Sequence, residues 1–308
     1  MKKYIFYLLM LLLPIAAKSE TPKKDLPKYY ETINGLTADE LIIELQNICK
    51  EKYNTKFTYD DVWDAFGKTD IINENYIWDI YSDCLYTFRI HQQGSETPKD
   101  DECGYYNREH SIPKSWFGGT TKKNSPGVDL FHIYPSNARA NSLRNNHIYG
   151  EVFDTISTSI DRTSAYGTSK EIMCEYTIAG IICSQKPNVN VFEPNDEYKG
   201  DLARGILATI IKWANRYPFN LKDGEMFFSN DYSKNGLYGL TEYGVVLLLK
   251  WHREDPVSNK EIIRNNAIED SQGDRNPFID YPELIEYIWG EYSGNVVNIN
   301  NLIIYKKN

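Results

Sequence analysis

The sequence predicts a single α+β domain in which helices predominate, and three observations support that fold class. Hydrophobic residues make up 41% and charged residues 25% of the 308, a globular composition that excludes a chain disordered or collagen-like throughout. Apolar residues recur at helical spacing in several long runs, whereas segments with strand character are short and scattered. No internal repeat or low-complexity linker divides the chain, so we expect one main domain.

The first nineteen residues have the features of a signal peptide. Lys2 and Lys3 precede an apolar run from residue 4 to residue 17, and small residues stand at the two positions that signal cleavage after Ser19 requires. The run is shorter than the roughly 20 residues of a membrane-spanning helix, although an uncleaved anchor remains the alternative. We therefore expect residues 1–19 to be removed, leaving a chain that is secreted or periplasmic and has no membrane association.

Residues 20–54 are expected to form a polar lead-in followed by the first helix. Thr37 and Glu40 have the spacing of a capping box and precede apolar residues at helical spacing, so that helix should be capped at Thr37. Further helices are predicted over 136–146 (capped by Ser136), 201–217 (ended by Pro218), 241–255 and 259–270, and strands over 76–82, 105–107 and 128–134. Residues 291–308 form a tail that could add a strand or trail off.

Five cysteines allow disulfides in an exported chain but do not indicate a zinc site. No two of them have the C-x-x-C spacing that is typical of structural zinc. Cys84 with Cys103, and Cys174 with Cys183, are two conceivable pairs, and the odd number leaves at least one thiol free or intermolecular.

The charge pattern indicates a local cationic region in an acidic chain. The formal net charge is -9, which argues against a surface covered with basic patches. Between residues 108 and 147, however, six lysines and arginines accompany only two acids. A cationic rim around a carboxylate and a histidine suits a phosphodiester better than a sugar or a peptide.

The segment from residue 105 to residue 151 carries the most informative pattern. Its predicted order is strand, loop, strand and short helix, with Glu109 and His110 adjacent at the end of the first strand. Asn141, Arg144 and Asn145 are three and four residues apart, so they share one face of the helix. A helix packed on the hairpin could aim Asn141 at a metal ion held by Glu109, while His110 addresses a nearby water molecule.

Each of these residues also has an ordinary structural explanation. Glu109 could be a surface acid and Asn141 a plain helix residue, because spacing alone is only a moderate signal. The other histidines are expected to be structural: His91, His147 and a half-buried His132, with His252 either lining a cleft or holding a loop.

The ordered motifs resemble the bacterial endonuclease I family, whose core is the ββα-metal, or His-Me, finger. The strings that carry the resemblance are NREHSIPKSWFGG and DLFHIYPSNARANSLRNNHIYGEV, and the strings VFEPNDEYKGDLAR, WHREDPVSNKEIIRNN and GDRNPFIDYPELIEYIWG resemble its secreted branch. The resemblance covers roughly residues 55 to 290. It implies a helix-rich single domain around a ββα-metal core. It also implies a secreted, metal-dependent, largely non-specific endonuclease that cleaves DNA, with RNA as a further candidate substrate, to 5′-phosphate ends.

The resemblance also implies roles for the three residues at the centre of the motif. His110 would be the general base, since a histidine with a pKa near ~6.5 is largely neutral at pH 7. Glu109 and Asn141 would hold one Mg²⁺, for which Mn²⁺ or Ca²⁺ could substitute, because hard oxygen donors favour these ions over zinc.

One departure from the family concerns the phosphate contact. Family members place an arginine between the Glu-His pair and the second strand, but this chain has none from residue 111 to residue 138. Lys122 and Lys123 are the cations of that loop, and a lysine offers a point charge instead of a bidentate fork. Arg144 or Arg204 could substitute.

Two other function classes stay open. A catalytically inactive relative, serving as an extracytoplasmic nucleic-acid-binding module, would keep the fold without metal-dependent turnover. A glycoside-cleaving or carbohydrate-binding protein would need two facing carboxylates, and no pair stands out. The expected partner is nucleic acid, and a monomer is expected.

Overall fold

The computed structural model describes residues 25–73, 75–94, 103–159, 161–173, 184–213, 216, 227–229 and 237–303. The expected signal peptide, Pro218 and the pair Cys174 and Cys183 lie outside these residues. Within them the fold is mixed α+β with helices predominating, as the sequence predicts. In the same residues, no helix combines the length and the apolar character that crossing a membrane would require.

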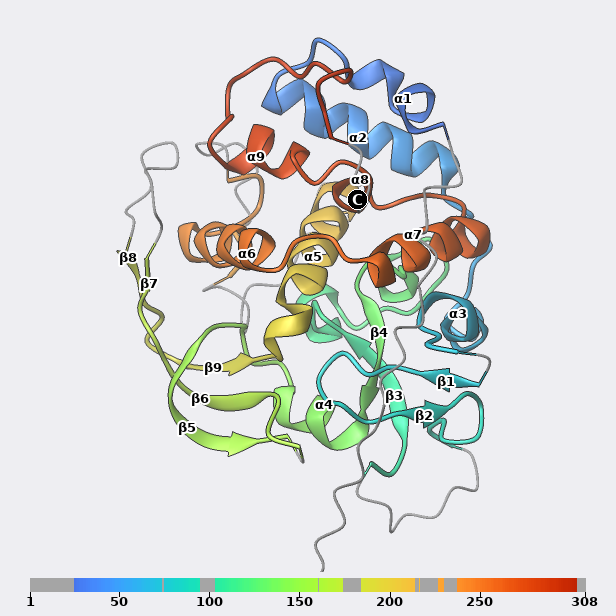
Figure 1. Cartoon of the computed structure of the whole chain (residues 1–308), viewed down its shortest axis with the longest axis vertical. Coiled ribbons are helices and arrows are strands. Elements are labelled where there is room, and N and C mark those ends of the chain that lie inside the picture. The colour runs from blue at the N-terminus through green and yellow to red at the C-terminus, as the bar shows by residue number, and fades with distance from the viewer. Residues whose placement is uncertain are drawn as a thin grey trace, which may run out of the picture.

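Most of the helices lie in the upper part of the molecule and most of the short sheets in the lower part, where the short helix α4 lies among them (Figure 1). The helices are α1 (Leu26–Tyr29), α2 (Ala38–Lys52), α3 (Asp61–Thr69), α4 (Ala138–Arg144), α5 (Lys199–Trp213), α6 (Glu242–Glu254), α7 (Asn259–Gln272), α8 (Pro277–Asp280) and α9 (Leu284–Trp289). The strands are β1 (Tyr76–Ile77), β2 (Tyr86–Thr87), β3 (Tyr106–His110), β4 (Ile133–Asn137), β5 (Val152–Thr158), β6 (Ala165–Ser169), β7 (Ile172–Met173), β8 (Ser184–Gln185) and β9 (Asn190–Glu193).

Helix α5 is the centre of the core. All of its residues are buried, including the polar ones, and it packs against α6 and α2. Because no face of α5 reaches solvent, its charged side chains need partners in the interior, as Lys212 has in Asp129 and Asp274. α5 begins two residues earlier than predicted, whereas α2 is capped at Thr37 by the predicted capping box with Glu40.

β1 and β4 are shorter than predicted, whereas β3 extends beyond residue 107 to His110. The strands are grouped in small antiparallel sheets. β3 pairs with β4, and β5, β6 and β9 form a three-stranded sheet in the order β5-β6-β9. The predicted strand over 76–82 is limited to β1, because the Asp79 carboxylate accepts the backbone N–H of Tyr81 and bends the chain. In the C-terminal tail, no strand occurs up to residue 303, and Val297 pairs with the backbone of Leu36 instead.

The β3–β4 hairpin and α4 give the strand, strand, helix order expected around Glu109 and His110. In the hairpin register Glu109 lies opposite Tyr134, and His110 lies opposite Ile133. The second strand begins later than predicted, at Ile133, because the Asp129 carboxylate accepts the N–H of Phe131 and forms a turn there. Pro135 lies inside β4, where its missing N–H is tolerated because each strand of a two-stranded sheet is an edge.

Candidate active site

A polar pocket of about 350 Å³ lies where β3 ends and α4 passes. It brings together the Glu109, His110 and Asn141 side chains that were singled out from the sequence. Its lining consists of Tyr59, Gln93, Asn107, Arg108, Glu109, His110, Pro113, Lys114, Ser115, Asn141, Asn145 and Asn146. Another hollow of about 390 Å³ is lined only by residues between Asp25 and Lys52 and contains no histidine. Of these two pockets, the one at β3 and α4 is the one that contains a histidine beside a buried carboxylate.

His110 is a buried histidine with a fixed tautomer. Its Nε2 lies 3.2 Å from the carbonyl oxygen of Gly127, which can only accept, so Nε2 carries the hydrogen and Nδ1 has the free lone pair. Burial, helped by the neighbouring His132, lowers the pKa of His110 well below its usual range. The imidazole is therefore neutral near pH 7 and can accept a proton at Nδ1.

His132 holds the same turn from the other side. Its Nε2 donates to the carbonyl of Pro126 at 2.7 Å, and its Nδ1 accepts the backbone N–H of Ile112 at 3.4 Å. It is fully buried, not half-buried as expected, and burial lowers its pKa to about 4. His132 is thus a neutral structural histidine beside the ring of His110, with ring centroids 5.5 Å apart.

The turn that both histidines contact requires a glycine. It is a 3₁₀ turn over Pro126–Val128, and a Cβ added to Gly127 would lie 1.8 Å from the carbonyl oxygen of Thr120. Because only glycine leaves room for that close approach, Gly127 fixes where its own carbonyl meets His110.

Glu109 is a buried carboxylate held by a tyrosine and an arginine. Tyr81 donates its hydroxyl to Oε1 at 2.8 Å, and Nε of Arg144 lies 3.6 Å from the same oxygen. Tyr81 also shares a hydrogen bond with the hydroxyl of Tyr149. Burial raises the pKa of Glu109 to about 7, although Arg144 and Tyr81 favour its charged form. The negative charge of Glu109 is thus only partly compensated by its protein neighbours.

Asn141 lies across the pocket on α4. Its Nδ2 donates to Oδ1 of Asn107 at 2.7 Å, which leaves Oδ1 of Asn141 as the remaining acceptor of the amide. Asn107 precedes Glu109 by two residues on β3, so the two side chains share one face of the strand. Within the described ranges no three His, Cys, Asp or Glu side chains form a group that could hold a metal ion, so the donors here are one carboxylate and amide oxygens.

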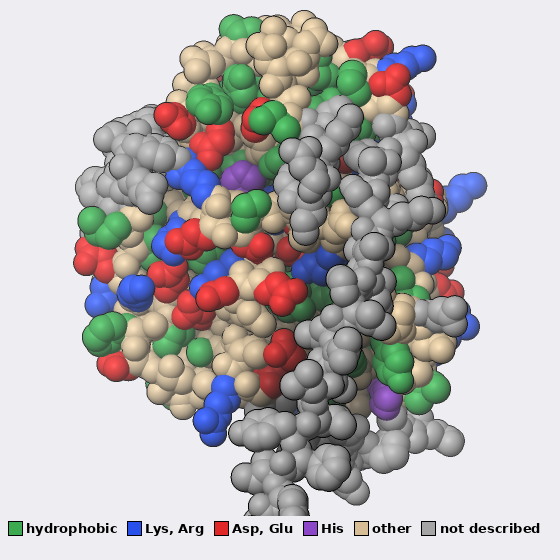
Figure 2. Space-filling view, in the orientation of Figure 1, with side chains coloured by type: hydrophobic (Ala, Val, Ile, Leu, Met, Phe, Trp, Pro, Cys, Tyr) green, Lys and Arg blue, Asp and Glu red, His purple; other side chains and the backbone are tan. Residues whose placement is uncertain are grey.

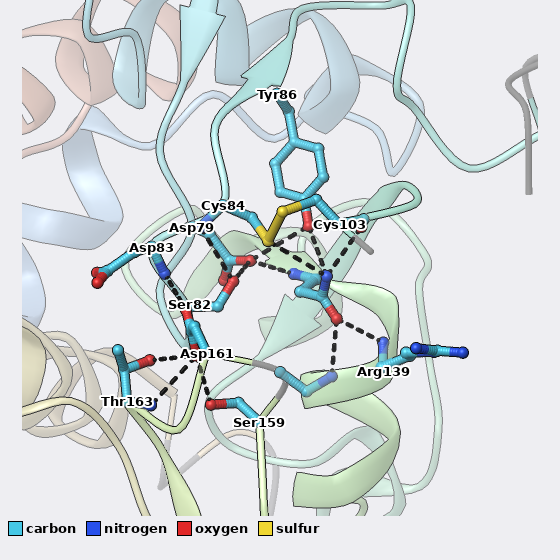
Figure 3. Close-up of a disulfide and its surroundings, with 12 residues drawn as sticks. Asp79, Ser82, Asp83, Cys84, Tyr86, Cys103, Arg139, Ser159, Asp161 and Thr163 are labelled. Carbon is cyan, nitrogen blue, oxygen red and sulfur yellow. Dashed lines mark hydrogen bonds between the residues drawn. A yellow bond between two sulfur atoms is a disulfide. The ribbon is translucent and has the colours of Figure 1, made fainter. Parts of the chain in front are cut away.

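Asn137 fixes the start of α4. It is the N-cap in place of the predicted Ser136, and its side-chain oxygen accepts the N–H groups of Arg139 and Ala140. Its Nδ2 donates to the Tyr86 hydroxyl and to the Cys103 carbonyl, beside the disulfide that joins Cys84 to Cys103. Figure 3 shows this disulfide directly at the start of the helix. One of the two conceivable pairs therefore forms, and it helps to place the helix that carries Asn141.

Residues 37–283 match the endonuclease I family. The chain belongs to that family. It is 30% identical over 275 residues to an extracellular ribonuclease of Bacillus amyloliquefaciens, which covers 87% of this chain and 80% of the relative. It is also 30% identical over 286 residues to an extracellular ribonuclease of Bacillus subtilis strain 168, with coverage of 90% and 83%. This member of the endonuclease I family is accordingly a nuclease, a phosphodiester hydrolase.

The two arginines that the sequence suggested as phosphate contacts in this endonuclease I chain, Arg144 and Arg204, are buried. Arg204 is 0% exposed, pairs with both oxygens of Glu261 and donates to the carbonyl of Asp255. Arg144 is 1% exposed and donates to the carbonyls of Ser111 and Asn145. Arg204 does not line the pocket, and in this arrangement neither guanidinium is open to a phosphate group arriving from solvent.

Lys122 and Lys123 are exposed but do not line the pocket. They lie in the loop between Phe117 and Pro126, where the hydroxyl of Ser125 donates to the carbonyl of Lys122. On the face of the molecule that Figure 2 shows, acidic and basic side chains are interspersed. No basic patch predominates on that face, in line with the acidic net charge of this endonuclease I member.

Arg108 and Lys114 line the pocket and were not selected from the sequence. The Arg108 guanidinium lies 3.4 Å from the ring centroid of Tyr59 and 4.3 Å from that of Trp63, and it donates to the Tyr59 carbonyl at 2.6 Å. Lys114 is exposed, 5.6 Å from the Tyr59 ring. The strand alternation was the signal that could have indicated Arg108, since it stands two residues before His110.

Proposed function

We propose that this chain is an exported, monomeric, metal-dependent endonuclease that hydrolyses RNA as well as DNA, without strong sequence preference, to 5′-phosphate ends. The observation that carries the proposal is the convergence of His110, Glu109 and Asn141 on one polar pocket. The extracellular ribonucleases to which the chain is similar support RNA as a substrate and export as the destination. The signal-like residues 1–19 support export as well.

His110 is the proposed general base. With Nε2–H held by the Gly127 carbonyl, Nδ1 takes a proton from a water molecule in the pocket, and that water attacks the phosphorus atom. The bond between phosphorus and the 3′-oxygen breaks, and the 3′-oxygen takes a proton from solvent, which leaves a 5′-phosphate and a 3′-hydroxyl. The fixed tautomer means that no ring rotation or proton exchange precedes the attack. The buried, neutral state of the imidazole keeps this base available across the neutral pH range.

Glu109 and Asn141 fit a magnesium ion. A buried carboxylate whose charge is incompletely compensated gains from a cation, and the Asn141 amide oxygen is a second hard donor at the same pocket. When bound there, Mg²⁺ (or Mn²⁺ or Ca²⁺ in its place) supplies charge stabilisation to the phosphate in the transition state and to the leaving oxygen. Tyr81 and Arg144 orient Glu109 for that role.

Lys114 and Arg108 are the proposed replacements for the arginine that the loop lacks. Both line the pocket, and Arg108 is held in one orientation by Tyr59 and Trp63. Positive charge at this wall favours the approach of a phosphodiester to His110. Lys122 and Lys123, which are exposed and outside the pocket lining, are proposed to contact the nucleic acid farther from the cleaved bond.

Cleavage assays test the proposal directly. Supercoiled plasmid and an unstructured RNA should be cleaved by the mature chain with Mg²⁺ and left intact with EDTA. His110→Ala should reduce the rate by at least ~10²-fold, in line with the usual contribution of a general base. His91→Ala serves as the matched control, because that half-buried histidine lies outside the pocket lining, and it should cleave at the native rate.

Calorimetry separates the metal ligands from the base. Glu109→Gln and Asn141→Ala should weaken Mg²⁺ binding measured by isothermal titration, whereas His110→Ala should leave it close to native. Cleavage that survives His110→Ala would assign the base to another residue. A chain that binds nucleic acid but cleaves neither polymer under any divalent ion would instead be the inactive binding module.

A further inference from the structure

Two stacked rings lie where α4 leads into the three-stranded sheet. The imidazole of His147 stacks on the ring of Tyr166 in β6, with ring centroids 4.3 Å apart and planes inclined by 28°. Both residues are half-buried. The hydroxyl of Tyr166 accepts a hydrogen bond from Asn190 on β9, and the backbone N–H of His147 donates to the carbonyl of Arg144. The stack is therefore anchored on both sides, yet part of it reaches solvent.

The stack adjoins the catalytic pocket. Asn145 and Asn146, the two residues before His147, line that pocket. Tyr166 lies opposite Phe192 in the sheet register, so the two side chains share a face. Phe192 packs against Tyr81, whose hydroxyl holds Glu109. The face of the sheet that carries Tyr166 is thus the face directed toward the site.

The backbone between the pocket and the stack is strained. Asn145 has φ 50° and ψ -125°, a conformation that costs a non-glycine residue on the order of 1–3 kcal/mol. It is held there because its N–H donates to the Asn141 carbonyl and its carbonyl accepts from Arg144. This abrupt turn at the end of α4 directs Asn145 and Asn146 to the pocket and His147 to the sheet.

The chemistry of the stack suits a nucleobase more than a phosphate. Burial and the nearby Arg144 lower the pKa of His147, so its ring is neutral and flat at pH 7. Proteins that bind single-stranded nucleic acid use such rings as stacking surfaces, because every base has a π-face. When a phosphate of the substrate occupies the pocket, an adjoining base would be near His147, because His147 directly follows the pocket residues Asn145 and Asn146.

We propose that His147, backed by Tyr166, forms a subsite that stacks one base of a single-stranded substrate next to the cleaved phosphodiester. The proposal rests on the nuclease function and identifies what the site recognises beside the phosphate. A base held by stacking contributes binding without selecting its identity, which suits cleavage with little sequence preference.

Oligonucleotides with single abasic positions test the subsite. Single-stranded RNA with one abasic residue moved stepwise past the cleavage point would be assayed with the wild type and with His147→Ala. We expect His147→Ala to raise KM about 10-fold with kcat changed less than about 2-fold, in line with the loss of one stacked base. An abasic residue at the subsite should raise KM for the wild type but not further for the variant.

Three comparisons make the outcome decisive. His147→Phe should recover most of the affinity lost in His147→Ala, because it restores an aromatic face, whereas a purely structural role of the imidazole would give no recovery. Tyr292→Ala removes an exposed tyrosine outside the pocket lining and should behave as wild type.

Abasic effects that are equal in wild type and His147→Ala at every position would overturn the subsite while leaving the nuclease function intact. If the wild type cleaves nothing, the nuclease proposal fails, and the same series read as Kd by fluorescence anisotropy still decides the subsite.

Discussion

At the scale of single residues, His110 and His132 donate to consecutive carbonyl groups of one turn. His110 contacts the carbonyl of Gly127 and His132 that of Pro126. His132 also accepts the backbone N–H of Ile112, just beyond the end of β3. The orientation of His110, the proposed base, therefore depends on a turn that is distant from it in sequence but tied to both strands. Such support is what holds a catalytic group in a productive geometry.

Gly127→Ala should lower activity without removing any side chain from the pocket. The added methyl group would meet the Thr120 carbonyl and move the turn, so the Gly127 carbonyl would leave its position at His110. A shift of about 1 Å at a catalytic group can cost ~10²-fold in rate, so we expect a fall of that order in kcat with KM little changed. Steady-state kinetics, with circular dichroism as a check on folding, measures this. An unaltered kcat would show that the carbonyl is not needed.

Asp79 should make the stability of the protein depend on pH. Burial raises its pKa to about 7, although Ser82, Tyr81 and Asn137 donate hydrogen bonds to it. Between about pH 4 and pH 7 the folded state thus keeps a proton that the unfolded state releases, so this carboxyl contributes less stability as the pH rises. The free energy of unfolding should be measured with urea at pH 4, 5.5 and 7 for the wild type and for Asp79→Asn. The value for the wild type minus the value for the variant should fall as the pH rises. A difference constant with pH would contradict the raised pKa.

At the scale of elements, the start of α4 depends on one side chain. Asn137→Ala removes the N-cap of the helix and leaves the Tyr86 hydroxyl and Cys103 carbonyl without the amide donor. We expect a loss of about 2–4 kcal/mol in the free energy of unfolding, from the cap and the lost buried hydrogen bonds together. Asn137→Ser keeps a capping oxygen and should lose less. Equal losses in denaturant titrations of the two variants would mean that the cap contributes nothing.

The elements that the sequence predicts best are those fixed by local patterns. The capping box at Thr37 and the apolar spacing of α5 and α6 depend only on near neighbours, and they appear as expected. The order of β3, β4 and α4 was also predictable, whereas the start of β4 was not. Asp129 forms a turn there because Lys212 and Trp213 of α5 hold its other carboxylate oxygen, a contact 83 and 84 residues along the chain.

Contacts between residues far apart in sequence also limited what could be predicted about the candidate site. Strand and helix spacing made Glu109, His110 and Asn141 candidates, and the resemblance of the ordered motifs to the endonuclease I family was needed to choose them. The sequence could not show which lysines and arginines are exposed and which are buried. Whether an arginine faces solvent depends on packing against residues distant in sequence, as Arg204 packs against Glu261.

At the scale of the whole molecule, buried and exposed cations should respond differently to substitution. Arg204→Met leaves Glu261 without its partner in the interior, so we expect a loss of about 3–5 kcal/mol in unfolding free energy. Where that variant is folded, its KM should stay near native.

Lys122→Ala with Lys123→Ala should leave stability unchanged and raise KM, most strongly at low salt. Cleavage of DNA and RNA by that double variant with native KM would exclude its loop from substrate binding.

Cys49 on α2 gives the folded molecule a protected thiol. It is 2% exposed, its Sγ faces the Arg275 carbonyl, and burial raises the pKa of the thiol well above its usual range. A thiol in that state is neither ionised nor accessible, so an alkylating reagent can reach it only when α2 separates from the core. The rate of Cys49 alkylation, measured by site-resolved mass spectrometry, would therefore report how often this part of the native enzyme opens. The measurement needs no denaturant and no engineered cysteine.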